Sequence, residues 1–231
     1  MDGETVAVVL PIALKEVFDD IAPKFTAATG HRFQTALMLN PEVPDYIAGG
    51  ATWSIALSNP SYIKRIVDAG FCDGGSRPLG YSPLAFAMRG QSHAAPLERP
   101  AKIADFLRRA ASVAVTGAGT SGAHFSKLAA DLGISELMRG KLRLLPGGGP
   151  MAALKNGDVE VAALPLSNIA PVSGVFATAI CPDDMGVHIE FSLCRCAGAN
   201  AATRQFADWL RDPDVLSDLH GLGLRHGLSP A

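Results

Sequence analysis

The chain has 231 residues, of which 48% are hydrophobic and 18% are charged, and its formal net charge is −2. A chain of this length buries one large core or two smaller ones. Charges of both signs are interspersed, so no basic stripe predicts nucleic-acid binding, and no uncharged apolar run reaches the ~18 residues that membrane insertion needs.

Strand and helix signals alternate along the chain, which predicts an α/β protein with mostly parallel sheets. In the first third, apolar runs predict strands over 6–10, 33–39 and 54–58. Helices are expected between them: one with an apolar face that ends at Gly30, a short one over 43–48, and one that starts at Asn59-Pro60 and ends at Gly70.

The remaining elements follow the same alternation. The predicted order is an extended run over 77–89, a flexible surface loop over 90–100, a helix over 103–111, a strand, turn and helix over 112–133, a strand over 141–145, a turn over 146–150, a helix over 151–155, a strand over 159–164, an extended run over 187–196, and helices over 201–210 and 213–219. Asn200 is expected to cap the first of these two final helices.

The strand, turn and helix over 112–133 is the strongest functional signal. Gly117, Gly119 and Gly122 form the turn, and Thr120 and Ser121 stand where the helix begins. The first N–H groups of a helix have no acceptor within it, and the helix dipole adds positive potential there, so the turn is suited to binding an anion.

These three glycines also match the G-x-G-x-x-G fingerprint of dinucleotide-binding proteins. That fingerprint requires an acidic residue at the end of the next strand, whereas the strand over 141–145 is followed by Pro146 and Gly147. A small anion is therefore favoured over a dinucleotide, and a purely structural turn is the remaining alternative.

The four cysteines, Cys72, Cys181, Cys194 and Cys196, are expected to be ordinary buried thiols. Cys194 and Cys196 point to one face of a strand-like run, and neighbours two apart on one strand rarely form a disulfide. The chain has no H-x-x-x-H or H-E-x-x-H spacing, so no metal site is predicted, and nothing indicates a cofactor.

The order and spacing of several segments resemble the type II periplasmic-binding-protein family, in particular its molybdate-binding-protein-like group. The segments that carry the resemblance are ALKEVFDDIAPKFTAATGHRF, IAGGATWSIALSNPSYIKRIVDAG, SRPLGYSPLAFAMRG, VAVTGAGTSGAHFSKLAADLGI, LKNGDVEVAALPLSNI and FADWLRDPDVLSDLHGLGL. The resemblance implies an α/β fold of two lobes, each a central sheet flanked by helices. Lobe one would comprise 1–80 and 191–231 and lobe two 81–190, with two hinge crossings near 80–87 and 187–194.

The resemblance also implies a ligand in the cleft between the lobes, held by helix N-termini. The ligand-binding residues expected on these grounds are Ile12, Ala13, Asn40, Arg77, Ser82, Gly119, Thr120, Ser121, Gly122 and Ser167. Three of these residues also have structural explanations that need no ligand. Arg77 would simply face solvent, the Asn40 side chain would form an Asx-turn before Pro41, and Ser167 would cap a short helix.

Departures from the family pattern bear on the ligand. The first turn, over 10–13, has no hydroxyl, Asn40-Pro41 replaces a Ser-Gly pair, and the Asp that commonly follows the Gly-Ala pair is absent after Gly50-Ala51. Because the hydroxyls for a tetrahedral oxyanion are missing while Thr120 and Ser121 are kept, an organic carboxylate is favoured over molybdate.

Two functions remain open. The first is a solute-binding protein for a small organic anion, with an ABC transporter permease as partner if the chain is exported. The second is a cytoplasmic, cofactor-independent isomerase of an unsaturated polycarboxylate, since the group resembles aconitate isomerase; His124 would carry the proton and Arg77 would clamp a carboxylate. A third hypothesis is that the chain is the ligand-sensing part of a transcriptional regulator. The sequence contains no DNA-binding helix pair or basic segment that would support it.

The first residues bear on the location. Asp2 and Glu4 stand where an export signal would be basic, and no small-residue cleavage site follows the apolar run from Val6 to Leu14. A native chain starting at Met1 is expected to be cytoplasmic, and a chain from which a signal peptide was removed is expected to be periplasmic.

Overall fold

The computed structural model describes residues 3–92 and 94–227, which divide into two compact units. Unit 1 contains the described residues of 1–81 and 190–228, and unit 2 contains those of 82–189. Two strands, β4 (Cys72–Arg89) and β9 (His188–Cys196), carry the chain from one unit to the other.

The sheet of unit 1 has the order β2-β1-β3-β9, with the first part of β4 beyond β9. Its strands are β1 (Thr5–Pro11), β2 (Arg32–Met38) and β3 (Ile55–Ser58), together with the unit's part of β9. Strand β1 pairs in parallel with β2 and with β3, whereas β9 runs antiparallel to β3. The carboxyl ends of β1, β2 and β3 therefore lie at one edge of this sheet.

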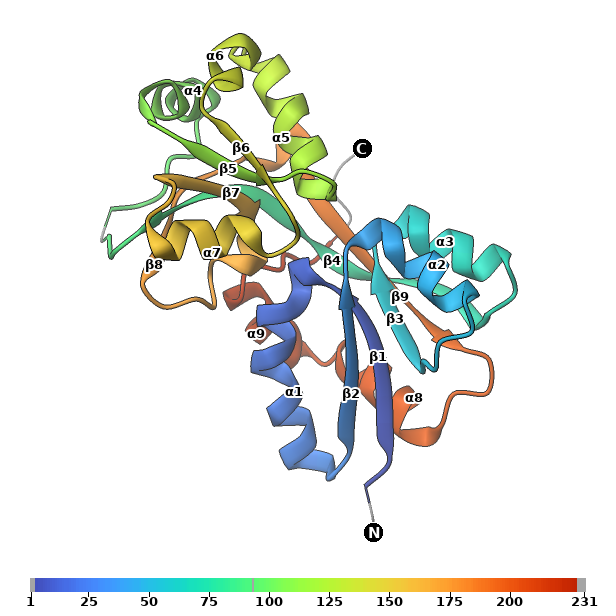
Figure 1. The fold of residues 1–231 in the computed structure, drawn as a ribbon. Helices are drawn as coiled ribbons and strands as arrows, with labels where there is room; N and C mark the ends of the chain where they lie inside the picture. Colours follow the sequence, from blue (N-terminus) through green and yellow to red (C-terminus); the bar gives the residue numbers. More distant parts are fainter. Residues whose placement is uncertain (1–2, 93, 228–231) are drawn as a thin grey trace. The chain divides into compact units, whose positions relative to one another are not determined.

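Helices cover both faces of the unit 1 sheet (Figure 1). They are η1 (Ile12–Leu14), α1 (Lys15–Thr29), η2 (Asn40–Glu42), α2 (Val43–Ala48), α3 (Pro60–Asp68), α8 (Ala201–Trp209) and α9 (Pro213–Gly221). Side chains alternate along the strands, so Val9 and Ala56 face α2 and α3, whereas Leu10 and Leu57 face α1, α8 and α9.

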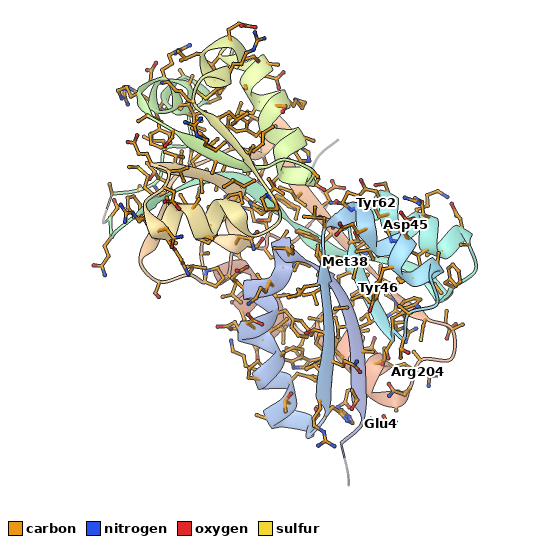
Figure 2. The ribbon with its side chains drawn as sticks, in the orientation of Figure 1. Glu4, Met38, Asp45, Tyr46, Tyr62 and Arg204 are labelled. Atoms are coloured by element: carbon orange, nitrogen blue, oxygen red, sulfur yellow. The ribbon has the colours of Figure 1, made fainter. Side chains whose placement is uncertain are left out.

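An aromatic cluster fastens α1 and α8 to the sheet. The ring centroids of Phe25 and Phe206 are 5.1 Å apart, and Phe33 lies 4.9 Å from Phe206. The start of α8 is further anchored by Glu4, whose Oε2 accepts a hydrogen bond of 3.0 Å from the backbone N–H of Ala202. Figure 2 labels Glu4 at the start of β1 and Arg204 on α8, at the same end of unit 1.

The sheet of unit 2 has the order β4-β7-β5-β6, and β8 pairs with β4 outside that path. Its own strands are β5 (Val113–Thr116), β6 (Leu142–Leu145), β7 (Val161–Pro165) and β8 (Val175–Ile180). Strand β5 is parallel to β6 and β7, and β4 is antiparallel to β7 and β8. The helices are α4 (Pro100–Arg109), α5 (Thr120–Asp131), α6 (Ser135–Arg139), α7 (Gly149–Asn156), η3 (Leu166–Asn168) and η4 (Asp183–Met185).

Two apolar layers enclose the unit 2 sheet. On one face Phe86 packs with Ile103 of α4, Phe125 of α5 and Met138 of α6. On the other face Ala85, Ala114 and Ala162 pack against Leu154 of α7. The small strand side chains let α7 approach the sheet closely, which agrees with the parallel strands being covered on both faces.

Several expectations from the sequence need correction. Strand β8 and helix α6 were not predicted, and α7 begins at Gly149, inside the expected turn, because Pro150 is suited to the first helical positions. The sheets are mixed rather than mostly parallel. Asn59 precedes α3 as expected, but its side chain makes no capping bond and Nδ2 donates to the Glu190 carbonyl at 2.6 Å.

The segment expected to be a flexible loop over 90–100 is held at one point. The backbone N–H of Leu97 donates to Thr178 at 2.8 Å, and Leu97 accepts from the N–H of Ile180 at 2.9 Å. His93, which the sequence places in this loop, lies outside the described residues. Among the residues that the structure covers, no helix combines the length and the apolar character needed to cross a membrane.

Candidate functional site

The turn between β5 and α5 in unit 2 is built for close packing. Gly119 is the N-cap of α5, with an extended backbone (φ −98°, ψ 165°), and Ser121 follows two residues later with 8% of its surface exposed. A Cβ at Gly122 would lie 2.0 Å from the carbonyl oxygen of Thr116, so glycine is required for α5 to start this close to the end of β5. The helix N-terminus is thereby held directly over the strand end.

Ser82 and Ser167 are brought together in the same unit. Both are fully buried, and the backbone N–H of Ser167 donates to Ser82 Oγ at 2.9 Å. The bond attaches η3, the turn after β7, to β4. In this bond Ser82 Oγ is the acceptor, so the hydroxyl proton of Ser82 takes no part in it.

Ser121 and Ser167 follow two strands that lie side by side. Strands β5 and β7 are parallel, with Ala114 opposite Ala162, so Thr116 at the end of β5 is level with the end of β7. Carboxyl ends of adjacent parallel strands meet at one edge of a sheet, which is where open α/β sheets bind ligands. The start of α5, Ser82 and Ser167 thus share one edge of the unit 2 sheet.

A buried polar cluster lies at the corresponding edge of the unit 1 sheet. Asn40 Oδ1 accepts hydrogen bonds from Ser58 Oγ at 2.9 Å and from the backbone N–H of Asn59 at 3.2 Å. Ser192 of β9 is buried directly opposite Ser58 in the sheet register. Because an amide oxygen can only accept, the Asn40 side chain can donate to an anion only through its NH₂ group.

Ile12 and Ala13 also lie at this edge of unit 1. They form η1 at the end of β1 and are half-buried, and Pro11 of β1 is paired with Met38, two residues before Asn40. Neither side chain carries a polar atom, so only their backbone groups are relevant to an anion. The structure therefore brings Ile12, Ala13 and Asn40 to one edge, as it does Ser82, Gly119, Thr120, Ser121, Gly122 and Ser167 in unit 2.

Arg77 is placed elsewhere in unit 1. Its Nη1 lies 3.3 Å from Asp208 Oδ1 of α8, and it lines a cavity of about 370 Å³ whose walls include Leu193, Leu216 and His226. None of Ile12, Ala13 and Asn40 lines that cavity. Arg77 is thus not grouped with the other unit 1 candidates.

His124 is half-buried in the second turn of α5. The sequence places His124 in the first helical turn, whereas it is the fifth residue of α5, one turn beyond the helix start. Its role as a proton carrier stays a prediction.

Four polar residues at these edges were not among the sequence candidates: Ser58, Asn59, Thr116 and Ser192 are all buried. Ser58 and Thr116 each end an apolar strand, and a polar residue at that position is the signal that would have found them. Ser192 could not be found in this way because it lies inside an apolar run, and only its pairing with Ser58 shows its place.

Within the described ranges, no group of three or more His, Cys, Asp or Glu side chains is arranged to hold a metal ion. The four cysteines are free thiols. Burial raises the pKa of Cys181 to about 12, so this thiol stays protonated and unreactive at neutral pH.

Residues 6–224 match the family described as bacterial extracellular solute-binding protein. The chain belongs to this family. The match spans both units and nearly the whole sequence, in agreement with the family resemblance seen in the sequence. No curated protein matches the chain at the sequence level.

Solved structures give the same fold. The periplasmic molybdate-binding protein of Azotobacter vinelandii superposes with a TM-score of 0.81 at 14% identity, covering 96% of this chain and 100% of that one. The sulfate-binding protein SubI of Mycobacterium tuberculosis H37Rv gives 0.71 at 16% identity, covering 96% and 86%. L-phospholactate-bound PEB3, a Campylobacter jejuni protein, gives 0.69 at 16% identity, covering 96% and 100%. The expected type II periplasmic-binding-protein fold is therefore confirmed, and the low identities carry no further inference about the ligand.

Proposed function

We propose that this protein binds a small organic anion and that the N-terminus of α5 in unit 2 receives a carboxylate of that ligand. The observation that carries the proposal is the contact between Gly122 and the Thr116 carbonyl, which holds the helix start against the strand end with Ser121 beside it. Backbone N–H groups and a hydroxyl at such a position suit a carboxylate. Ser82 and Ser167, at the same sheet edge, are further polar groups of the proposed site.

The polar cluster of unit 1 supports an organic acid over a tetrahedral oxyanion. The Ser58 hydroxyl faces both the carbonyl and Oδ1 of Asn40, at 3.2 and 2.9 Å, so it is engaged within the protein. The turn at Ile12 and Ala13 supplies no hydroxyl. With the Ser58 hydroxyl engaged and no hydroxyl in the first turn, this edge of unit 1 favours a planar carboxylate over a tetrahedral oxyanion, which has more oxygens that accept hydrogen bonds.

The solved relatives are compatible with this ligand class. Two are named for molybdate and sulfate, and PEB3 was solved with L-phospholactate, which carries a carboxylate as well as a phosphate. The fold thus accommodates an organic acid in at least one relative. The proposed role is to capture the solute outside the cytoplasmic membrane and to deliver it to an ABC transporter permease, and detection of the protein in a periplasmic fraction tests this location.

A ligand screen tests the proposal. The purified protein is heated with molybdate, tungstate, sulfate and phosphate in one set, and with mono-, di- and tricarboxylates in the other. A ligand present at about 100 times its Kd adds about 2.7 kcal/mol to the free energy of unfolding, which is easily seen as a rise in Tm. Calorimetric titration of the best acid then gives its affinity.

We expect stabilisation by one or more organic acids and none by the inorganic oxyanions. A rise in Tm with molybdate or tungstate alone contradicts the proposed ligand class.

The enzymatic alternative is tested by incubating the protein with cis- or trans-aconitate and following the two isomers by NMR. Interconversion of the two isomers would replace the binding proposal with an isomerase that uses His124 or a neighbouring group.

A further inference from the structure

Three of the four cysteines converge at one place in unit 1. Cys72 is the first residue of β4, and Cys194 and Cys196 lie near the end of β9. Cys72 precedes Cys194 by 122 residues and Cys196 by 124 in the sequence, so only the fold brings it to the other two. The fourth, Cys181, lies in the core of unit 2.

Backbone hydrogen bonds fix this arrangement. The N–H of Ala197 donates to the Phe71 carbonyl at 3.1 Å, which places the residue before Cys72 beside the residue after Cys196. On the other side of β9, the N–H of Cys196 donates to the Ser54 carbonyl at 2.9 Å, and Cys194 is paired with Ala56. Residues two apart on a strand share a face, so Cys194 and Cys196 both point toward the side of the sheet covered by α2 and α3.

Cys72 and Cys194 meet in one apolar cluster. Cys194 is fully buried among side chains of β1, β3, α2 and α3, and the half-buried Cys72 packs against this cluster together with Met38. Figure 2 labels Met38 at the end of β2 and Tyr46 on the neighbouring α2. One thiol of the pair is thus accessible and the other is enclosed.

The two thiols also differ in acidity. A hydrogen bond with Cys194 lowers the pKa of Cys72, although burial opposes the shift. The same bond and burial raise the pKa of Cys194. Burial also raises the pKa of Cys196, so among these three thiols a lowered pKa is found at Cys72.

We propose that Cys72 and Cys194 form a redox-active dithiol that small-molecule disulfides convert to an intramolecular disulfide. The Cys72 thiolate attacks one sulfur of the disulfide RSSR, forms a Cys72–S–S–R bond and releases RS⁻. Cys194 then loses its proton, attacks the Cys72 sulfur, forms the Cys72–Cys194 bond and releases the second RS⁻. Both RS⁻ ions take up the thiol protons, so two protein thiols and RSSR give one protein disulfide and two RSH.

The product joins the start of β4 to the end of β9. Cys194 is the expected partner because Cys72 packs against the apolar cluster in which Cys194 is buried, whereas the half-buried Cys196 is not part of that cluster. Cys181 cannot compete, since it belongs to the core of the other unit. The cross-link lies within unit 1 and therefore does not depend on the proposed ligand site.

Oxidation with glutathione disulfide, followed by mass spectrometry, tests the proposal. The reduced full-length protein is incubated with excess oxidised glutathione, and remaining thiols are blocked with N-ethylmaleimide. We expect an intact mass about 2 Da below that of the reduced chain before blocking, and two blocked thiols rather than four. Trypsin cleaves after Arg195 and so separates Cys194 from Cys196, and cleavage after Glu190 separates Cys194 from Cys181.

Three substitutions distinguish the cysteines. Cys196→Ser is expected to keep the disulfide, whereas Cys72→Ser abolishes it. Cys194→Ala is expected to leave Cys72 as a stable mixed disulfide with glutathione. If the buried Cys194→Ala variant does not fold, Cys72→Ser at the half-exposed position still decides the question.

Four unmodified thiols in the wild-type protein would overturn the proposal. It would also be overturned by a Cys72–Cys196 link as the main product, or by disulfide formation that survives Cys72→Ser.

Discussion

The side-chain oxygen of Ser82 accepts a hydrogen bond of 2.9 Å from the backbone N–H of Ser167, which lies 85 residues later in the chain. Both residues are fully buried, so the bond forms without competition from water. It joins β4 to the turn after β7, at the sheet edge where α5 begins. The contact therefore shapes the proposed site in unit 2 as well as stabilising the unit.

Replacing Ser82 tests this dual role. Ser82→Ala removes a buried acceptor, and we expect the free energy of unfolding in urea to fall by about 1–3 kcal/mol. Ser76→Ala, an exposed serine on the same strand, is the matched control and is expected to stay within about 0.5 kcal/mol of wild type. Equal stability of the two variants would show that the Ser82–Ser167 bond contributes little.

Ser121 is expected to contact the ligand. Ser121→Ala removes one hydroxyl from the start of α5, and a hydrogen bond to a charged group contributes about 1.5–3 kcal/mol, so affinity for the best organic acid should fall roughly 10- to 100-fold. Ser126→Ala provides the control, because the Ser126 hydroxyl donates to the Gly122 carbonyl within the same helix. Calorimetry that gave both variants the wild-type affinity would remove Ser121 from the site.

Gly122 is expected to tolerate no side chain. In Gly122→Ala the new methyl group would meet the Thr116 carbonyl oxygen, so α5 must move away from β5, at a cost of about 1–3 kcal/mol or more in unfolding free energy. Gly140→Ala is the control, since a Cβ there meets no atom within 4 Å. Urea unfolding of both variants checks the difference. A Gly122→Ala protein as stable as Gly140→Ala would contradict the close packing of this turn.

Asn40 offers a test of charge at the unit 1 edge. Asn40→Asp keeps an acceptor oxygen for Ser58 and for the N–H of Asn59 while adding a negative charge, so anion affinity should fall at least about tenfold. Because Asn40 is buried, the added carboxylate also lowers the free energy of unfolding, so affinity is measured below the unfolding range of the variant. Gln34→Glu adds the same charge at an exposed position of β2 and controls for net charge. Equal affinities of the two variants in calorimetric titration would exclude Asn40 from the neighbourhood of the ligand.

The buried thiol of Cys181 predicts a loss of stability at high pH. Its pKa is raised by burial to about 12 in the folded state, while a thiol of the unfolded chain ionises near 8.5, so above that pH the unfolded state binds fewer protons. Between pH 9 and pH 11 this group alone should lower the unfolding free energy by up to about 1.4 kcal/mol per pH unit. Cys181→Val should show a smaller slope when both proteins are unfolded in urea under a phosphine reductant. Identical slopes would contradict the burial of this thiol in the folded state.

Much of the fold follows from local patterns. The apolar spacing of Val17, Ile21 and Phe25, with Gly30 behind them, predicts α1 and its end, and Gly30 does adopt the left-handed conformation, with φ 74°. The glycines between β5 and α5 predict the helix start in the same way, and the Asn200 cap is made as expected, with its side chain accepting from the N–H of Thr203. Periodicity and capping act over a few residues, so the sequence alone carries them.

Contacts between distant segments were decided by the tertiary structure. The Asn59 side chain reaches Glu190 rather than capping its own helix, Arg77 turns toward Asp208, and Cys72 meets Cys194 only because β4 runs beside β9. The sequence around each of these side chains does not single out its partner, because residues of the same chemistry occur at several places along the chain. Which one it uses depends on strand order and register, and these are set by the burial of whole apolar faces rather than by the residues next to it.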